Sequence, residues 1–386
     1  MQQRFSVIAN NSKSPFSMVF SYYSNYVGMM DMFGVYSLPK KERELDAVKT
    51  ISVEMARARQ FGFTASEIKL AKETLLSKIK KQYDERNKMK SEDWAFMLQG
   101  NFSQFKTPQP GLEIEFDLYQ KFLPQITIED VNAEAKQIFI EKNNVISITA
   151  SEIKLPTENE IIEAFNNIDK SLVVPYEDKV VASNLISKKI KAGKVAKTET
   201  DNTTNSQIWT LKNGIKVVLK QTDFKENEIQ LKAYSPGGYT LYELNDNINA
   251  RSCVDITTNS GLGDFKQDDL DKFLSSKNIE LSPYVSEFSE GFYGNSTRED
   301  FETMMQMIYL YFTAPRFDDE AFSSYVEKMK SILDNKSNNP NSLWREQVGR
   351  TLNNNSKFSE PIDIKDLQTL NNKRAQEIYK ERFSDP

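Results

Sequence analysis

The chain contains no histidine and only one cysteine, Cys253, among its 386 residues. A serine–histidine or cysteine–histidine catalytic pair is therefore excluded, because each needs an imidazole as its base. Zinc sites built on histidine or on several cysteines are excluded for the same reason. One thiol cannot form an internal disulfide, so the cysteine content is compatible with both the cytosol and the periplasm.

The sequence also lacks long hydrophobic runs and an excess of positive charge. No apolar run approaches the roughly 18 residues needed to cross a membrane, and the first residues, MQQRFSVIANN, lack the layout of a secretory signal peptide. The formal net charge of −5 disfavours nucleic-acid binding by a broad basic face. Short lysine-rich patches at 78–81 and 188–191 sit among acids, as solvated faces do. We therefore expect no membrane span and no nucleic-acid partner.

Large apolar side chains are plentiful, with 24 Phe and 16 Tyr, so sizeable cores can form. The length exceeds one average domain and suits two. Composition changes over 156–205, which contains two prolines, many Lys and Glu, and the polar run KTETDNTTNS. We predict two units, 1–155 and 207–386, joined by a long linker over 156–205 that holds one short helix near 158–165.

The first unit shows strand patterns followed by helical ones. Residues 16–23 and 31–38 are aromatic and β-branched, which predicts two strands of a half-buried sheet. Residues 42–60 then follow a helical period, and Gly62 ends that helix. The predicted inward-facing side chains of this helix are Leu45, Val48, Ile51 (or Ser52) and Met55.

Two capping signatures mark later helices of this unit. Thr64 and Glu67 form a T-x-x-E capping box, and Thr127 precedes Asp130 in the same way. The first of these helices has an apolar stripe of Ile68, Leu75, Leu76 and Ile79, and the second is predicted to bury Val131, Ala135, Ile138 and Phe139. Residues 145–149 (VISIT) read as a buried core strand.

The second unit begins with a predicted hairpin. Residues 208–211 and 215–219 flank Asn213-Gly214, which favours a tight turn of type I′. Further strands are predicted over 228–234, 279–284 and 287–294, and helices over 249–260 and 264–274. Thr297 with Asp300 is expected to cap a helix whose buried face carries Phe301, Met304, Met305, Ile308 and Phe312.

A weak internal repeat relates the two units. Each has a pair of helices followed by Ile-x-Ile-x-Asp, at 126–130 and 362–366, which opens a helix ending near Phe139 or Phe383. In the first unit a core strand is predicted next, whereas the second unit stops at Asp385-Pro386. The expectation is that the chain is part of a larger protein.

Few residue patterns point to chemistry. The acidic clusters 268–271 and 318–320 could in principle hold a hard cation, but the first lacks a calcium loop's glycine and the second starts a helix. Residues 260–263 (SGLG) favour a helix-ending turn over a phosphate loop, and Pro236-Gly237-Gly238 a strand-ending turn. Nothing singles out two carboxylates for glycoside hydrolysis. The methionines Met304, Met305 and Met307 are predicted to pack in the core.

Longer stretches resemble a known family. They are LKNGIKVVL at 211–219, YSPGGYTLY at 234–242, SGLG at 260–263, YVSEFSEG at 284–291 and YLYFTAPRFD at 309–318. The first unit contributes RARQFGFT at 57–64, Glu67 and ERNK at 85–88. Together these residues resemble the insulinase/pitrilysin-like zinc peptidases, especially the large two-halved bacterial members.

The resemblance implies tandem α+β domains, each a mainly antiparallel sheet backed by helices, with two halves closing around a chamber. It also implies a zinc motif, H-x-x-E-H, on a helix. Here the matching helix is 249–260, and Arg251, Val254 and Asp255 stand where the histidines and glutamate would be. The sequence thus predicts no catalytic and no metal-binding residue, and it singles out no substrate-binding residue.

Within this family one half carries zinc and the other keeps the fold without ligands. The resemblance makes 1–155 the later domain of the catalytic half, with 1–10 as the tail of a helix, and 207–386 the first domain of the non-catalytic half. The leading hypothesis is a central, inactive segment of a periplasmic zinc endopeptidase, which forms the peptide-binding chamber and hinge. Its partners would be peptides or unfolded segments and an upstream zinc-bearing domain. The alternative is a scaffold or binding protein with a peptidase-like fold and no catalysis.

Overall fold

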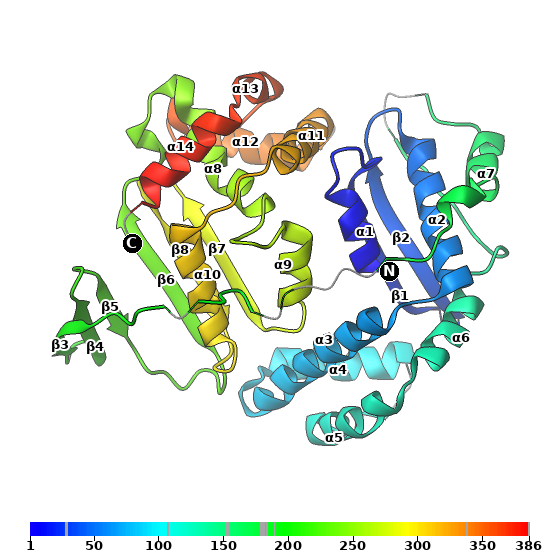
Figure 1. The fold of residues 1–386 in the computed structure, drawn as a ribbon, viewed down its shortest axis with the longest axis horizontal. Coiled ribbons are helices and arrows are strands. Elements are labelled where there is room, and N and C mark those ends of the chain that lie inside the picture. The colour runs from blue at the N-terminus through cyan, green and yellow to red at the C-terminus, as the bar shows by residue number, and fades with distance from the viewer. Residues whose placement is uncertain are drawn as a thin grey trace.

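The computed structural model describes residues 1–27, 30–105, 108–150, 154–177, 182, 184–188, 190–336 and 339–384. It is 52% helical and 17% strand, and its strand pairings are antiparallel, which confirms the predicted α+β class. Two units lie side by side, with the N-terminal elements on the right in Figure 1 and the C-terminal elements on the left. Residues 385–386, where the sequence analysis expected the next core strand of the second unit, lie outside the described residues.

The N-terminal unit combines one β-hairpin with six helices. Its elements are α1 (Gln2–Ala9), β1 (Phe16–Val27), β2 (Met30–Pro39), α2 (Glu44–Phe61), α3 (Ala65–Asp84), α4 (Ser91–Gly100), α5 (Leu112–Phe122) and α6 (Ile128–Ile138), with short turns η1 (Arg86–Lys88), η2 (Asn101–Phe105) and η3 (Leu123–Gln125). Both predicted strands and the helical start of the chain are confirmed. One face of the hairpin packs on α1 and α2 around Phe5, Phe16 and Val19.

Local signals located the helix ends well. Gly62 ends α2 with a positive φ of 71°, and the capping boxes of Thr64 with Glu67 and of Thr127 with Asp130 are both present. Burial was harder to predict. On α3, Ile68, Leu75 and Ile79 of the apolar stripe are half-buried, whereas Leu76 is 36% exposed. On α6, Ala135 is buried as predicted, and Phe139 just after it is buried too.

The predicted core strand at 145–149 is wrong. Residues 145–149 adopt no strand, and Val145 is 93% exposed. A strand needs a paired neighbour to satisfy its backbone, and β1 and β2 pair only with each other in the described part of the chain. The apolar run therefore has no sheet to join here.

The connecting region is more structured than predicted. The short helix is confirmed as α7 (Glu158–Asn166), with a capping box of Thr157 and Glu160. It packs on α2, where Ser52 Oγ donates to the carbonyl of Phe165 at 2.6 Å. After η4 (Lys170–Leu172), β3 (Val195–Asp201) lies in the predicted linker. Its Lys/Thr/Glu alternation is polar on both faces, so it gave no strand signal.

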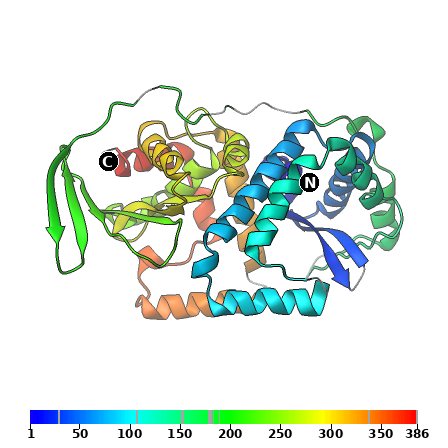
Figure 2. The same ribbon diagram turned by 90° about the horizontal axis from the view of Figure 1, so that it is seen from below.

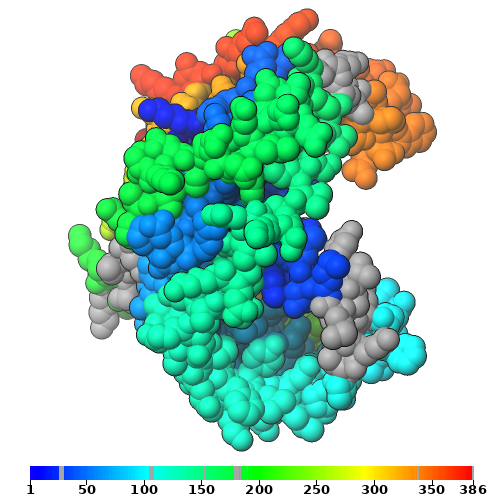
Figure 3. Space-filling view, turned by 90° about the vertical axis from the view of Figure 1, so that its right-hand side faces the viewer, coloured from blue at the N-terminus to red at the C-terminus, as the bar shows by residue number. Residues whose placement is uncertain are grey.

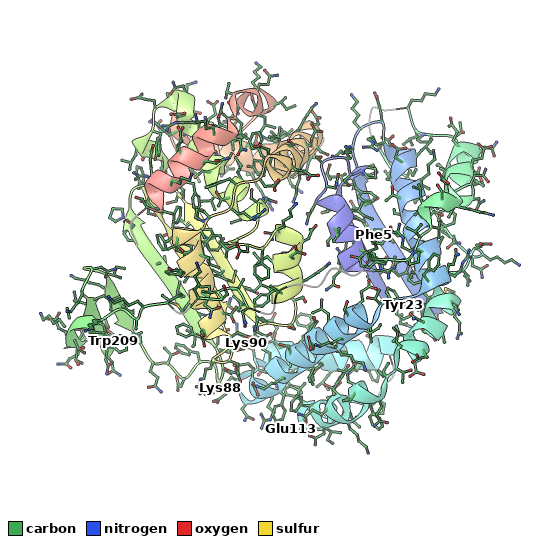
Figure 4. All side chains as sticks on the ribbon, in the orientation of Figure 1. Phe5, Tyr23, Lys88, Lys90, Glu113 and Trp209 are labelled. Atoms are coloured by element: carbon green, nitrogen blue, oxygen red, sulfur yellow. The ribbon has the colours of Figure 1, made fainter. Side chains whose placement is uncertain are left out.

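The C-terminal unit contains two three-stranded sheets and several helices. Its elements are β4 (Ser206–Leu211), β5 (Lys216–Leu219), β6 (Ile229–Pro236), η5 (Tyr239–Leu241), η6 (Leu244–Asp246), α8 (Asn247–Asn259), α9 (Gln267–Leu274), β7 (Ile279–Val285), β8 (Ser289–Ser296), α10 (Phe301–Thr313), α11 (Asp319–Lys336), α12 (Pro340–Leu352), η7 (Lys357–Ser359), α13 (Ile364–Thr369) and α14 (Asn372–Arg382). The sheets have the orders β3-β4-β5 and β6-β8-β7. The first sheet, which carries Trp209, stands apart from the helices in Figure 4.

The main core lies between the β6-β8-β7 sheet and α8, α10 and α14. Its centre is Phe292 on β8, whose ring lies 5.8 Å from Tyr311 and 5.5 Å from Phe383 between centroids. The face of α10 differs from the prediction. Met304 and Met307 are buried as core residues, whereas Met305 is 42% exposed.

Three details of this unit correct the sequence interpretation. Helix α10 begins at Phe301 with Asp300 as N-cap, so Thr297 does not cap it. Asn213 does not have a positive φ, whereas Gly214 has φ 93° and donates to the carbonyl of Leu211. The turn is therefore a three-residue loop with a left-handed glycine, not type I′. The last predicted helix is split into α13 and α14 at Leu370.

Candidate functional site

Helix α8 is the helix that the sequence analysis matched to the family's zinc motif, and it lies inside the C-terminal core. Cys253 and Ile256 face the core, and α14 packs along α8. The Cys253 thiol donates to the carbonyl of Ala250 at 3.2 Å, and burial raises the pKa of this thiol to about 12. A thiol that stays protonated and buried cannot serve as a nucleophile at neutral pH.

The three residues at the motif positions do not form a zinc site. The Arg251 guanidinium donates to the carbonyl of Glu360 at 2.6 Å and lies 5.6 Å from the Tyr239 ring centroid. Val254 is buried and has no metal-binding atom. Asp255 is partly exposed to solvent. Partial burial raises the pKa of its carboxyl, and the nearby positive charge of Lys328 limits that rise. Zinc needs at least three protein ligands, so this donor set does not fit the metal.

The acidic clusters at 268–271 and 318–320 do not form a cation site either. Asp268 accepts a hydrogen bond from Asn10 at 2.6 Å, and Asp318 caps α11 by accepting from the backbone of Glu320 at 2.9 Å. Burial, helped by the charge of Asp268, raises the pKa of Asp271 to about 6. Among the described residues, no three His, Cys, Asp or Glu side chains are grouped as a metal site would need.

The glycine-rich turns have structural roles. In the 260–263 turn, the backbone N–H of Gly261 donates to Thr258, that of Leu262 to Phe265 and that of Gly263 to Ala314. These donors are occupied, so the turn cannot cradle a phosphate, and its interpretation as a helix end is confirmed. The strand-ending turn at Gly237-Gly238 is also confirmed, and there Gly238 donates to a carboxylate oxygen of the buried Glu290 at 2.6 Å.

A cavity of about 270 Å³ lies where α8 meets the outer edge of β7. Asp255 belongs to its wall, so the cavity adjoins the position of the missing metal motif. The lining residues come from α8, α9, β7, β8 and α10: Val254, Asp255, Thr258, Gln267, Leu270, Leu274, Leu281, Ser282, Pro283, Tyr293, Met307 and Tyr311. Sequence reasoning missed this site because its residues are up to 57 positions apart, as the numbers of Val254 and Tyr311 show (311 − 254 = 57).

The second candidate feature is the polar contact between the units. At the end of α3, the buried Glu85 carboxylate accepts from the backbone N–H groups of Asn227, at 2.8 Å, and Glu226, at 3.3 Å. The Asn227 side chain donates to Asp84 at 3.0 Å and to Glu299 at 2.9 Å. Lys88, labelled in Figure 4, follows directly in η1 and lies 3.8 Å from Glu226.

A lysine completes this contact. Lys80 Nζ lies 2.6 Å from Asp84 in its own helix and 3.1 Å from Glu299 of the other unit. Hydrogen bonds from Asn227 and Lys80 hold the pKa of Glu299 at about 2. Elsewhere, Asn278 Nδ2 donates to Ser77 Oγ at 2.7 Å, so α3 meets the C-terminal unit over about two turns. In Figure 2, α3 lies between the two units.

Two residues that carry the resemblance in the N-terminal unit, Arg57 and Glu67, form ion pairs inside that unit. Arg4 is 1% exposed and pairs with Glu67 at 2.7 Å through two nitrogens, while also donating to the carbonyl of Gly62 at 3.0 Å. Its guanidinium lies 4.5 Å from the Tyr176 ring centroid. Arg57 pairs with the buried Glu54. Seen from the side in Figure 3, the N-terminal unit, in blue to green, faces the viewer, and the orange segment that includes α12 projects beyond it.

Sequence comparison finds relatives that are zinc proteases. The chain is 23% identical over 338 residues to the "Zinc protease PQQL-like" of Arabidopsis thaliana, a match covering 86% of the chain and 33% of that protein. It is 20% identical over 318 residues to the "Probable zinc protease PqqL" of Haemophilus influenzae Rd, covering 81% and 34%. The chain thus spans about a third of the length of the curated relatives it matches. No profile of a known protein family matches it.

Structure comparison finds a similar fold in a solved protease structure. The ferredoxin protease FusC, as a mutant in complex with Arabidopsis ferredoxin, matches with a TM-score of 0.55 and 15% identity, over 100% of this chain and 43% of FusC. The periplasmic protease PqqL from Escherichia coli matches with a TM-score of 0.47 and 18% identity, over 100% and 43%. No helix in the described part of the chain is long and apolar enough to span a membrane. In sequence the chain is therefore similar to PqqL-type zinc proteases of the insulinase-like zinc peptidase family, and its fold is similar to that of the ferredoxin protease FusC.

Proposed function

We propose that this chain is a non-catalytic part of a zinc-dependent endopeptidase of the PqqL type. The observation that supports the proposal is that Arg251, Val254 and Asp255, the α8 residues that match the positions of the zinc motif, cannot hold zinc. Its relatives are zinc proteases about three times as long as the matched segment. Zinc would be held by an upstream domain of the same polypeptide, and the chain alone would be inactive.

Its role in that protease is to form a wall of the peptide-binding chamber and to act as a hinge. The polar contact at Glu85, Asn227 and Glu299 supports the hinge role, because it consists of a few hydrogen bonds and exposed ion pairs. Such a contact costs little to open, compared with a large apolar interface. The partners would be peptides or unfolded protein segments. We place the protein in the periplasm, as the resemblance to bacterial family members implies.

The test extends the chain with the residues that precede it in its gene. Zinc content by mass spectrometry and cleavage of a quenched fluorescent peptide are measured for both lengths. We expect the extended protein to bind one zinc ion and cleave the peptide, and the 386-residue chain to do neither. If the extended protein binds no zinc and cleaves nothing, the chain belongs to a scaffold or binding protein that has a peptidase-like fold, and the proposal is wrong.

A further inference from the structure

The cavity beside α8 offers mostly hydrogen-bond acceptors. Asp255 contributes a carboxylate at its open side, and Thr258 and Ser282 contribute hydroxyls. Thr258 already donates its proton to the carbonyls of Val254 and Asp255, both at 3.1 Å. Its oxygen is therefore left to accept, so the cavity suits a ligand that donates several hydrogen bonds.

One buried acceptor in this wall has no partner. Gln267 Nε2 donates to Asp271 at 2.8 Å, which sets the orientation of the side-chain amide. The Gln267 Oε1 atom is buried and accepts no hydrogen bond from the described residues. A buried polar atom without a partner destabilises the fold, because it has lost its hydrogen bonds to water. A bound donor next to Gln267 would therefore offset that destabilisation.

The wall has negative charge and aromatic rings but no cation. No lysine or arginine lines the cavity in the ranges that the structure describes. From outside the lining, α11 presents the charge of Lys328 and the hydroxyl of Tyr325 to Asp255. Tyr293 and Tyr311 also line the cavity, and tyrosine rings attract cations. The charge and the rings both favour a positively charged group.

The rest of the wall is apolar and matches the stem of a long side chain. Leu270, Leu274, Leu281 and Met307 form this part. Lysine has an apolar four-carbon stem and a charged tip, and such side chains place the stem on apolar surface. Pockets for drug-sized ligands have about 300–1,000 Å³, so a cavity of about 270 Å³ suits one side chain rather than a whole small molecule.

The position of the cavity links this side chain to a peptide. Leu281, Ser282 and Pro283 belong to β7, which is the outer strand of its sheet and pairs only with β8 among the described strands. An outer strand can pair with an extended peptide through its free backbone groups, and neighbouring pockets then select alternate side chains.

We propose that the cavity between α8 and β7 binds the protonated side chain of a lysine in an extended peptide. This inference rests on the proposed function, since it names a feature of the peptide that the chamber would hold. Asp255 and Gln267 Oε1 accept from the ammonium group, and Leu274 and Met307 contact the stem. Asp255 therefore acts as a specificity-determining residue at the position where the family's metal motif is missing.

The test uses N-acetylated, C-amidated nonapeptides that carry a fluorophore and have lysine or norleucine at the centre. Their binding to the 386-residue chain is followed by fluorescence anisotropy. We expect the lysine peptide to bind at least 10-fold more tightly than the norleucine peptide, as one charge-assisted hydrogen bond is worth about 1.5–3 kcal/mol. Asp255→Asn and Gln267→Met should each reduce this preference. Asp264→Asn, an exposed aspartate outside the cavity, should leave it unchanged.

The outcomes separate this inference from the proposed function. If both peptides bind equally well and Asp255→Asn changes neither, the lysine site is wrong while peptide binding stands. If neither peptide binds, both the lysine site and the peptide-holding role are wrong. If Nα-acetyl-lysine amide competes as strongly as the whole peptide, the site takes a free amine, and the peptide part of the inference is overturned.

Discussion

Replacing Glu85 by alanine is expected to loosen the contact between the two units. Glu85 is 8% exposed, and its carboxylate accepts from two backbone N–H groups, those of Asn227 at 2.8 Å and Glu226 at 3.3 Å. Lys225 adds an ion pair at 3.9 Å. The alanine variant removes both acceptors, so the 225–227 turn keeps only the side-chain hydrogen bond from Asn227 to Asp84 and the ion pair of Glu226 with Lys88.

The size of the effect follows from these contacts. A hydrogen bond to a charged group contributes about 1.5–3 kcal/mol, and an exposed ion pair about 0–1 kcal/mol. Glu226 is exposed, so water can replace part of its lost bond. We therefore expect the contact to lose about 1.5–3 kcal/mol, which corresponds to a 10- to 150-fold increase in the open fraction.

Hydrogen exchange followed by mass spectrometry measures this loss directly. The amides of Glu226 and Asn227 should exchange at least 10-fold faster in Glu85→Ala, while the β6-β8-β7 sheet keeps its protection. Glu113→Ala is the matched control. Glu113 is 61% exposed and pairs with Arg86 inside the N-terminal unit, so its removal should not affect the 225–227 turn. Equal exchange of this turn in Glu85→Ala and the parent chain would refute the reasoning.

Three further predictions concern pH, a turn and the thiol. The pKa of Glu299 is lowered to about 2 in the folded chain. The stability that its carboxylate adds to the contact between the units is therefore complete above the unfolded pKa of about 4.3 and is lost as the pH falls towards 2. Hydrogen exchange should show this contact weakening over that pH range, and less so in Lys80→Ala. Gly261→Ala should lower the free energy of unfolding in urea by at least about 1–3 kcal/mol, because φ is +97° and the new Cβ would lie 2.2 Å from a carbonyl oxygen. Gly349→Ala, in the open middle of a helix, should raise it by about 0.5–1 kcal/mol. Cys253 should react with a thiol reagent at pH 8 only after unfolding, since its pKa is about 12; fast reaction of the folded chain would contradict its burial.

Local features were predicted well from the sequence. The capping boxes at Thr64 and Thr127 depend on residues three positions apart, so the signal and the structure share one segment. The strands β6, β7 and β8 were also found, because each has its own apolar alternation or turn. The same holds for the left-handed glycine at Gly62.

Features that depend on distant partners were predicted poorly. Residues 145–149 have the composition of a strand but no neighbouring strand to pair with. Conversely, β3 has a polar composition and is a strand because β4 pairs with it. The cavity beside α8 and the contact at Glu85 join segments about 30 to 140 residues apart, and one sequence carries no signal for such pairs.

The central claim is that this chain binds peptides without being a metal site itself. Anisotropy of a labelled unfolded polypeptide, titrated with the chain in EDTA and again with one equivalent of zinc, tests it most directly. The account predicts the same binding curve in both conditions and an intact polypeptide afterwards. Zinc-dependent binding, or cleavage that EDTA abolishes, would contradict it.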